Sequence, residues 1–369
     1  RLAKAFRLAC ETITLNIFED ELIVGTHGSG RRMGALVPEI SWKWLAKELD
    51  SIQTRPRDPY HIDPEQERLF VEEIIPYWKG KSLEENALAR FPEDTLKIGV
   101  DTDILDTEMK WRSHVGEITP DFSDIIFPKG FRAICDDAKE KLKTLEYTNA
   151  EDLDKIDYYN ASIEACEGII TLGKRYAQYA AEMAKKEQDP GRKKELEAIA
   201  ANCCRVPEYS PRNFWEAGQM LWFVMLGCFL SENCPAFNIG RFDMYMNPFL
   251  QADLKTDSID KEFAQEIINC LWIKIAELIW LLPENGSRYY AGYSGFTNLS
   301  VGGRNIDGSD AVNGVSFMAV EATSQVALPQ PSLSVIIHPD TPEEFLLACC
   351  RLSRKGIGFP AFHNDRVGT

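Results

Sequence analysis

The chain has 369 residues, enough for one large single-core domain or two average domains. Its formal net charge of −16 argues against a surface for nucleic acid or anionic membranes, because both need clustered Lys and Arg. The ten cysteines are scattered through apolar segments of a chain too long to need disulfides, so we expect thiols in a reducing cytoplasm.

The first hundred residues are expected to be mainly helical. The predicted elements are, in order, a helix within 1–17, a short strand at 22–24, a loop rich in Gly and Arg over 26–38, and helices over 42–49 and 65–78. The second of these helices follows Asp63-Pro64, a pair that favours a helix start. No signal peptide precedes Arg1, and the missing initiator Met leads us to expect a natural N-terminus further upstream.

Long amphipathic and apolar helices are predicted for the middle of the chain. Apolar residues at alternating spacings of three and four predict a helix over 152–186, and Asp189-Pro190-Gly191 ends it. A second helix is expected over 193–202. Ser210-Pro211 is expected to start a buried helix through 214–230, whose apolar run is too short to span a bilayer.

The last third of the chain changes to strand–helix–strand order. A helix is predicted over 260–282, buried strands of a mixed sheet over 296–301 and 333–337, and helices over 310–325 and 342–355. This alternation indicates an α/β layer. We see no internal repeat and no linker, so the sequence predicts one α/β domain with a thick coat of helices.

Several motifs suggest chemistry that their context does not support. The stretch 28–34 follows a predicted strand but has one residue too many for a dinucleotide fingerprint, and we favour a loop that faces substrate or a dimer partner. The adjacent pairs Cys203-Cys204 and Cys349-Cys350 lie in helical patterns and are interpreted as core residues. His338 is interpreted as a turn residue. No histidines fall at metal-ligand spacing, so no metal site is predicted.

Ten short segments, taken in chain order, carry a resemblance to a known family. They are Leu22–Gly25 with Pro38–Trp42; Ile75–Lys81; His114 with Pro120-Asp121 and Gly130; Arg205-Val206-Pro207 with Phe214–Ala217 and Gln219; Gly240-Arg241-Phe242-Asp243; Phe296 with Asn298; Gly302-Gly303; Asp307-Gly308 with Asn313; Gln330-Pro331-Ser332; and Gly358-Phe359-Pro360. Together they resemble the glycyl radical enzymes, the relatives of pyruvate formate-lyase.

The resemblance implies a fold and a missing remainder. Members of the family form a barrel of ten strands inside a coat of helices. The barrel consists of two five-stranded halves that run antiparallel to each other. The chain is therefore expected to be α/β, with a mainly helical coat over 1–205 and the first half-barrel over 206–369. The thiyl Cys and the glycyl Gly of the family are expected beyond Thr369, so no catalytic residue is predicted here and the chain alone is expected to be inactive.

The resemblance also implies residues that contact substrate. They are Arg112, His114, Asp121, Glu232, Asn233, Tyr290 and Phe296. Arg112 would clamp a carboxylate or sulfonate, and His114 would bind a hydroxyl or move a proton. Tyr290 and Phe296 would wall an apolar cavity. From spacing alone, His114 is interpretable as an ordinary loop histidine. Arg241 and Asp243 are interpreted as a structural ion pair at a helix start.

The implied function is radical cleavage of a C–O, C–N, C–S or C–C bond in a small polar metabolite, by the lyase, dehydratase or decarboxylase branch. Formate C-acetyltransferase (pyruvate formate-lyase) is the enzymatic alternative, and an inactive scaffold with the same fold is the alternative of another class. No bound cofactor is expected. A separate S-adenosylmethionine radical activase would install the glycyl radical. The expected partners are a small-molecule substrate, the activase and a second copy, in the cytoplasm or a bacterial microcompartment.

Overall fold

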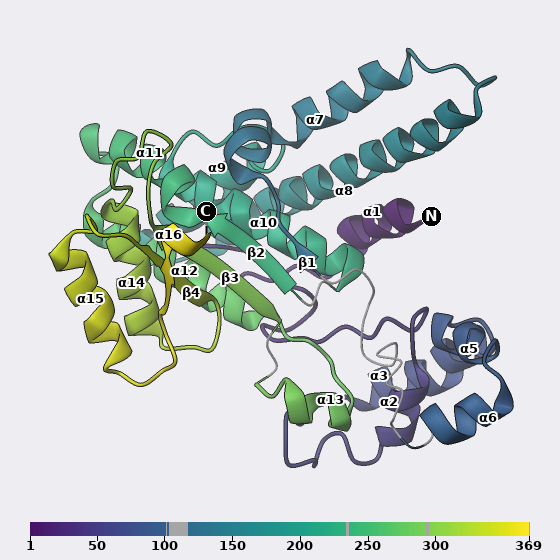
Figure 1. The fold of residues 1–369 in the computed structure, drawn as a ribbon. Coiled ribbons are helices and arrows are strands. Elements are labelled where there is room, and N and C mark those ends of the chain that lie inside the picture. The colour runs from purple at the N-terminus through teal and green to yellow at the C-terminus, as the bar shows by residue number, and fades with distance from the viewer. Residues whose placement is uncertain (101, 103–116, 234–235, 293–294, 369) are drawn as a thin grey trace.

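A parallel sheet of five strands forms the centre of the fold (Figure 1). The computed structural model describes residues 1–100, 102, 117–233, 236–292 and 295–368. The strands, which lie in the order of the sequence, are β1 (Glu117–Ile118), β2 (Ala236–Arg241), β3 (Phe296–Gly302), β4 (Ser332–Ile337) and β5 (Ala361–Asn364). Each neighbouring pair is parallel, so the expectation of a mixed sheet was wrong. Apolar runs mark a buried strand but carry no signal for its direction.

Helices connect and cover the strands. They are α1 (Leu2–Thr12), α2 (Lys43–Glu48), α3 (Pro64–Leu69), η1 (Phe70–Ile74), α4 (Ile75–Trp78), α5 (Leu83–Leu88), α6 (Glu93–Thr95), η2 (Leu96–Val100), η3 (Phe122–Ile126), α7 (Phe127–Leu142), α8 (Ala150–Lys186), α9 (Pro190–Arg205), α10 (Phe214–Glu232), α11 (Phe242–Lys255), α12 (Lys261–Glu277), α13 (Glu284–Tyr289), α14 (Gly314–Val326), α15 (Glu343–Ser353) and α16 (Asp365–Gly368). The η elements are π-helical turns: η1 and η3 lead into α4 and α7, and η2 follows α6.

The strand order places the helices on one face of the sheet. When parallel neighbours follow one another in sequence, right-handed crossovers all return on the same side. Alternate residues of the strands, such as Phe237, Leu299 and Val335, are accordingly buried in one apolar core with α10, α11, α12 and α14. We call the opposite face, which includes Asn298 and Ser332, the inner face.

The sheet has two open edges. Among the described residues, β1 pairs only with β2 through two residue pairs, and β5 pairs only with β4. All four residues of β5 are exposed. A closed barrel has no such edges. The geometry is that of half a barrel, as the resemblance implied.

Helix α10 forms the centre of the core. Its N-cap is Asn213, whose Oδ1 accepts from the Glu216 N–H at 2.8 Å, rather than the expected Ser210. Although α10 is long and apolar enough to cross a membrane, 78% of its apolar window is buried inside the protein, which is the pattern of a core helix.

The segment Leu22-Ile23-Val24 is buried but forms no strand, contrary to expectation. A glutamine takes the place of a strand partner. The Gln219 side chain on α10 accepts from the Val24 N–H at 2.9 Å and donates to the Val24 carbonyl at 2.8 Å. A buried backbone must find such partners, and a run of three apolar residues does not reveal that a side chain will supply them.

A charged cluster fastens the same segment to α12. The Lys274 ammonium, 2% exposed, lies 2.6 Å from a Glu21 oxygen and 2.8 Å from a Glu277 oxygen. Both carboxylates are buried as well. Because the two carboxylates share a single ammonium inside the protein, the loss of Lys274 would leave two buried carboxylates without their cation.

A second, smaller core lies beside the sheet, where Figure 1 shows α2, α3, α5, α6 and α13 grouped together. Trp42, Trp44 and Phe70 belong to it, packed against the chain that leaves α12. The Tyr60 hydroxyl donates to the Trp280 carbonyl at 2.5 Å, so this helical group is attached to the segment that leads into β3.

Candidate functional site

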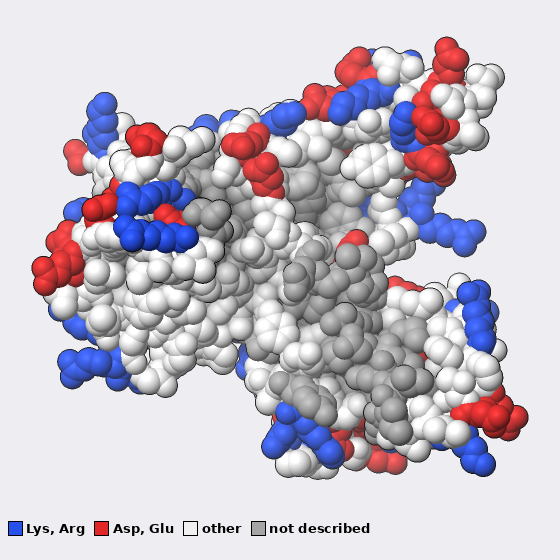
Figure 2. All heavy atoms as spheres, viewed as in Figure 1, with Lys and Arg blue, Asp and Glu red and all other residues white. Residues whose placement is uncertain are grey.

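The inner face of the sheet is lined by small neutral polar side chains. Alternation along β3 and β4 places Asn298, Ser332 and Ser334 there, because their neighbours Leu299 and Leu333 enter the core. Strands β2 to β5 contain only two ionisable residues, Arg241 and His363. In Figure 2 the surface around β3 and β4 is mostly white, with blue and red side chains at its margins. This face therefore suits a small polar ligand better than a multiply charged one.

Asn298 is held in one orientation by the neighbouring strand. Its Oδ1 accepts from the Ser334 hydroxyl at 3.0 Å and from the Ser332 hydroxyl at 3.2 Å. The single Ser332 hydroxyl proton is shared with the Thr297 carbonyl, which lies 2.9 Å from the same hydroxyl oxygen. Since the carboxamide oxygen is occupied, the NH₂ group carries the side chain's remaining donors. Asn298 thus offers two fixed N–H donors on the inner face.

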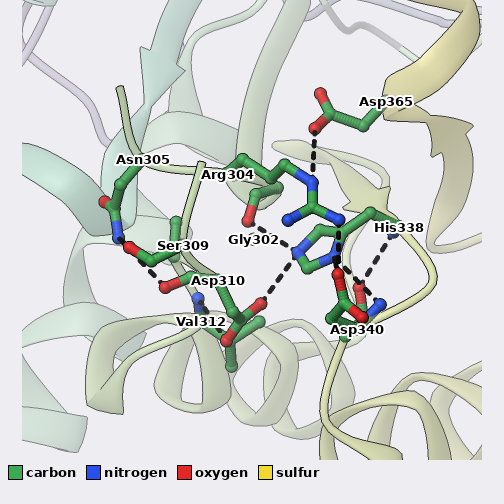
Figure 3. Close-up of polar contacts among 12 residues, drawn as sticks. Gly302, Arg304, Asn305, Ser309, Asp310, Val312, His338, Asp340 and Asp365 are labelled. Atoms are coloured by element: carbon green, nitrogen blue, oxygen red, sulfur yellow. Dashed lines mark hydrogen bonds and ion pairs between the residues drawn. The ribbon is translucent and has the colours of Figure 1, made fainter. Parts of the chain in front are cut away.

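The carboxyl ends of the strands are joined by a polar network (Figure 3). The His338 ring follows β4 and is fully buried. Its Nε2 lies 3.0 Å from Asp310 and 3.1 Å from the Gly303 carbonyl, while its Nδ1 accepts from the Asp340 N–H at 3.2 Å. These contacts assign the proton to Nε2. His338 does lie in a turn, as expected, but its ring ties the ends of β3 and β4 together.

Arg304 extends this network to β5. Its Nη2 lies 2.6 Å from Asp340, and its Nε lies 4.0 Å from Asp365, the first residue after β5. The guanidinium of Arg304 lowers the pKa of the Asp340 carboxyl. Together with His338, this residue fixes the rim of the sheet over three strands.

Arg241 and Asp243 do not form the direct ion pair that the sequence suggested. Arg241 donates to the carbonyls of Gly302 and Arg304, and Asp243 Oδ2 accepts from the Gly302 N–H at 2.7 Å and from the Ser316 hydroxyl at 2.6 Å. Both side chains act on the end of β3. Burial raises the pKa of Asp243 to about 6, because the carboxylate has lost its water and hydrogen bonds offset this only in part.

The raised pKa of Asp243 predicts a pH-dependent stability. A carboxyl whose pKa rises on folding binds its proton more tightly in the native state. Its contribution to the free energy of unfolding therefore decreases as pH increases from about 4 to 6. Asp243→Asn has no carboxyl to titrate, so it should not show this loss. We expect its free energy of unfolding to rise by roughly 3 kcal/mol relative to that of the wild type between pH 4 and pH 7. Denaturant unfolding of the purified protein at several pH values measures the difference.

Asp257→Asn is the matched control for this measurement. Asp257 is exposed at a left-handed position (φ 52°), where Asn is tolerated equally well. Its stability difference from the wild type should not change with pH in the same way. A constant difference between Asp243→Asn and the wild type from pH 4 to 7 would contradict the assigned protonation.

Two of the predicted site residues lie together at the amino end of the inner face. The rings of Tyr290 and Phe296 contact edge to face, with centroids 5.3 Å apart. Tyr290 is half-buried beside Trp280, and Phe296 is 48% exposed at the start of β3. The two aromatic rings form a wall at one end of the face that carries Asn298.

The other predicted residues lie elsewhere. Asp121 is exposed and caps η3 by accepting from the Asp124 N–H at 2.8 Å. Glu232 ends α10 and lines a groove between α1, α8 and α10, and buried Asn233 ends that helix in a left-handed conformation. Arg112 and His114 lie outside the described residues. These assignments to substrate remain predictions.

Sequence reasoning missed the functional potential of the Asn298–Ser332–Ser334 group. Asn298 and Ser332 occur in the segments that carry the family resemblance, but the hydrogen bonds between them depend on the register of β3 with β4, which pairs Asn298 with Ser332. Spacing along the chain shows no such register.

The cysteines and acidic groups form no further centre among the residues that the structure describes. The nine described cysteines are all free thiols. In each adjacent pair the first residue, Cys203 or Cys349, is buried and the second is exposed. The prediction of core residues was therefore correct for one of each pair, since adjacent helical residues face different directions. Within the described ranges no group of three or more His, Cys, Asp or Glu could hold a metal ion.

Residues 1–369 match the family described as Pyruvate formate lyase-like. The chain thus belongs to this family of glycyl radical enzymes, and the predicted family and α/β half-barrel are confirmed. The chain is 32% identical to isethionate sulfite-lyase of Nitratidesulfovibrio vulgaris, over 99% of its own length and 45% of that enzyme. It is 33% identical to trans-4-hydroxy-L-proline dehydratase of Clostridioides difficile, over 99% of its length and 46% of the relative.

The solved structures agree with the sequence relatives. The chain superimposes on the glycerol-bound B12-independent glycerol dehydratase from Clostridium butyricum with a TM-score of 0.91 and 37% identity, covering 99% of this chain and 46% of that one. The chain therefore spans about half the length of the relatives it matches, as a half-barrel should.

Proposed function

We propose that this chain is the N-terminal half of a glycyl radical enzyme of the lyase, dehydratase or decarboxylase branch, which cleaves a C–O, C–N, C–S or C–C bond in a small polar metabolite. The neutral, hydrogen-bonding inner face of an open half-barrel is the observation that carries this proposal. Relatives named as a sulfite-lyase and dehydratases support the branch.

The residues of the inner face would bind and orient the substrate. Asn298 would donate its two N–H groups to a hydroxyl, carboxylate or sulfonate oxygen, in the orientation that Ser332 and Ser334 impose. Tyr290 and Phe296 would exclude water from one end. Arg112 and His114 would complete the polar contacts, as the resemblance implies. Fixed donors in a water-excluded site are effective because they need no reorganisation.

A glycyl radical, once installed by a separate S-adenosylmethionine radical activase, supplies the unpaired electron for the bond cleavage. The open edges at β1 and β5 fit this requirement, because a second half-barrel would close them and seal the inner face from water. We place the radical-bearing Gly and Cys in that second half, and we propose that residues 1–369 alone are inactive. We also propose that the protein is a homodimer in the cytoplasm or a microcompartment. The free thiols at every described cysteine support a reducing location.

Anaerobic incubation of the full-length protein with a radical activase and S-adenosylmethionine tests this function. A glycyl radical signal in electron paramagnetic resonance, with turnover of isethionate, trans-4-hydroxy-L-proline, glycerol or 1,2-propanediol, is the expected result. Consumption of pyruvate and coenzyme A instead would indicate the formate acetyltransferase alternative. A full-length protein that forms no radical with any activase would favour the inactive scaffold.

Changing Asn298 to Asp is expected to lower kcat/KM about 10- to 100-fold while the protein stays folded. A carboxylate still accepts from Ser332 and Ser334, but it removes both N–H donors and repels an anionic substrate. A lost hydrogen bond to a charged group costs about 1.5–3 kcal/mol. Asn160→Asp on the exposed surface of α8 is the control. Unchanged steady-state kinetics in Asn298→Asp would exclude this residue from the substrate site.

A further inference from the structure

A cavity of about 460 Å³ lies between α12, the loop that holds Arg31 and Arg32, and the segments that lead into β3 and β4. Arg31 and Arg32 line it from the loop that the sequence predicted to face substrate or a dimer partner. Glu277 and apolar neighbours line it from α12. Gly292 and the residues just before β4, which end in Gln330, complete the wall. The volume suits a small metabolite.

The cavity adjoins the amino end of the candidate site. Gln330 Oε1 accepts from the Thr297 N–H at 2.8 Å, and Thr297 directly follows Phe296 in β3. Gly292 lies two residues beyond Tyr290, the aromatic partner of Phe296. The cavity wall is therefore continuous in sequence and hydrogen bonding with the aromatic end of the inner face.

The charge of the cavity is opposite to that of the chain. Two arginines and one carboxylate line it, although the whole chain carries a net charge of −16. The Glu277 carboxylate is already held by Lys274 at 2.8 Å, and burial raises the pKa of Glu277. A small anion that approaches the cavity would meet the guanidinium groups of Arg31 and Arg32, and positive charge at the mouth of a cleft accelerates the association of anionic ligands.

The donors of this cavity are held in place. The Arg31 guanidinium lies 4.7 Å from the centre of the Phe18 ring and reaches the Glu19 carbonyl at 3.4 Å. The Gln330 carboxamide is oriented by its bond to β3, with its oxygen occupied and its NH₂ group available to donate. A guanidinium already held by its neighbours loses less entropy on binding an oxyanion.

We propose that this cavity is the entry site for an anionic substrate, a small carboxylate or sulfonate, which Arg31 and Arg32 attract before it moves to the inner face. The inference rests on the proposed function and narrows its substrate class to anions. Arg31 and Arg32 act on capture and specificity and take no part in bond cleavage.

The test is the Arg31→Gln/Arg32→Gln double variant of the full-length, activated enzyme. We expect kcat/KM for an anionic substrate such as isethionate to fall about tenfold at low ionic strength, with kcat and the glycyl radical signal unchanged. The difference should shrink in 0.5 M salt, because salt screens long-range attraction. Turnover of neutral glycerol should not change. Saturation-transfer NMR, which measures the binding of isethionate, acetate and glycerol to the unactivated full-length protein, gives a second readout that needs no turnover.

Lys143→Gln/Lys155→Gln is the matched control, since it removes two positive charges near the tip of the α7–α8 arm (Figure 1). An equal loss in this control, or unchanged kinetics and unchanged anion binding in the arginine variant, would overturn the entry site. Stronger binding of glycerol than of isethionate and acetate would overturn it as well. Absence of the radical would instead contradict the proposed function, while NMR binding would still report on the cavity.

Discussion

Replacing Lys274 with Met is expected to lower the free energy of unfolding by about 3–5 kcal/mol. The substitution keeps most of the length of the side chain but removes the ammonium, which lies 2.6 Å from a Glu21 oxygen and 2.8 Å from a Glu277 oxygen. Both carboxylates would stay buried without the ammonium, although Glu21 keeps its hydrogen bond from the Phe18 N–H at 3.0 Å. Denaturant unfolding of the full-length protein at pH 7 measures the loss.

The triple variant Lys274→Met/Glu21→Gln/Glu277→Gln separates charge from packing. A buried ion cluster replaced as a whole by neutral groups is often tolerated, so most of the stability should return. If the single variant is as stable as the wild type, water must reach the cluster and the three groups are not mutually dependent. If the triple variant is no more stable than the single one, the packing of the Lys274 stem carries the effect.

Gly130→Ala is expected to cost at least about 4 kcal/mol or to prevent folding. Gly130 has φ 67° and ψ 165°, a conformation that is essentially restricted to glycine. An added Cβ would lie 2.6 Å from the Tyr209 carbonyl carbon and 2.7 Å from the Glu208 oxygen. Backbone cannot move aside as a flexible side chain can, and the next residue is hydrogen-bonded to Pro207. Soluble yield and thermal unfolding are the measurements.

Gly80→Ala isolates the contribution of backbone strain. Gly80 also has a left-handed φ of 76°, but no atom lies within 4 Å of the position that its Cβ would occupy. This variant should lose only about 1 kcal/mol. Similar losses in the two variants would show that the close approach of residues 208–209 to Gly130 is relieved by a small shift.

Long helices with a regular apolar repeat and the apolar strands β3 and β4 were predictable from the sequence, whereas the shorter strands β1 and β5 were not. The 37 residues of α8 repeat an apolar pattern over many turns, and the prediction for 152–186 agrees with Ala150–Lys186. Strand β1 has two residues, and β5 contains Asn and His with every residue exposed. Such segments show no alternation of buried and exposed positions, so only pairing with a neighbour defines them.

The candidate site was predictable only where the family resemblance points to its residues. The family resemblance predicts that Phe296 and Tyr290 contact substrate, and the structure brings their rings together. The orientation of Asn298 depends on two hydroxyls from another strand, and the position of Arg31 depends on Phe18 and Glu19. Contacts of this kind arise from packing between distant segments, which leaves no periodic signal in the chain.

The consecutive order of the strands has a consequence for synthesis on the ribosome. Each new strand pairs with the one made just before it, so the sheet can assemble progressively as the polypeptide emerges. Among the described strands, none inserts between two that were made earlier. The strand made last offers the growing edge at each stage, and once β5 holds that position its exposure makes it the place where nascent protein would be most prone to associate wrongly.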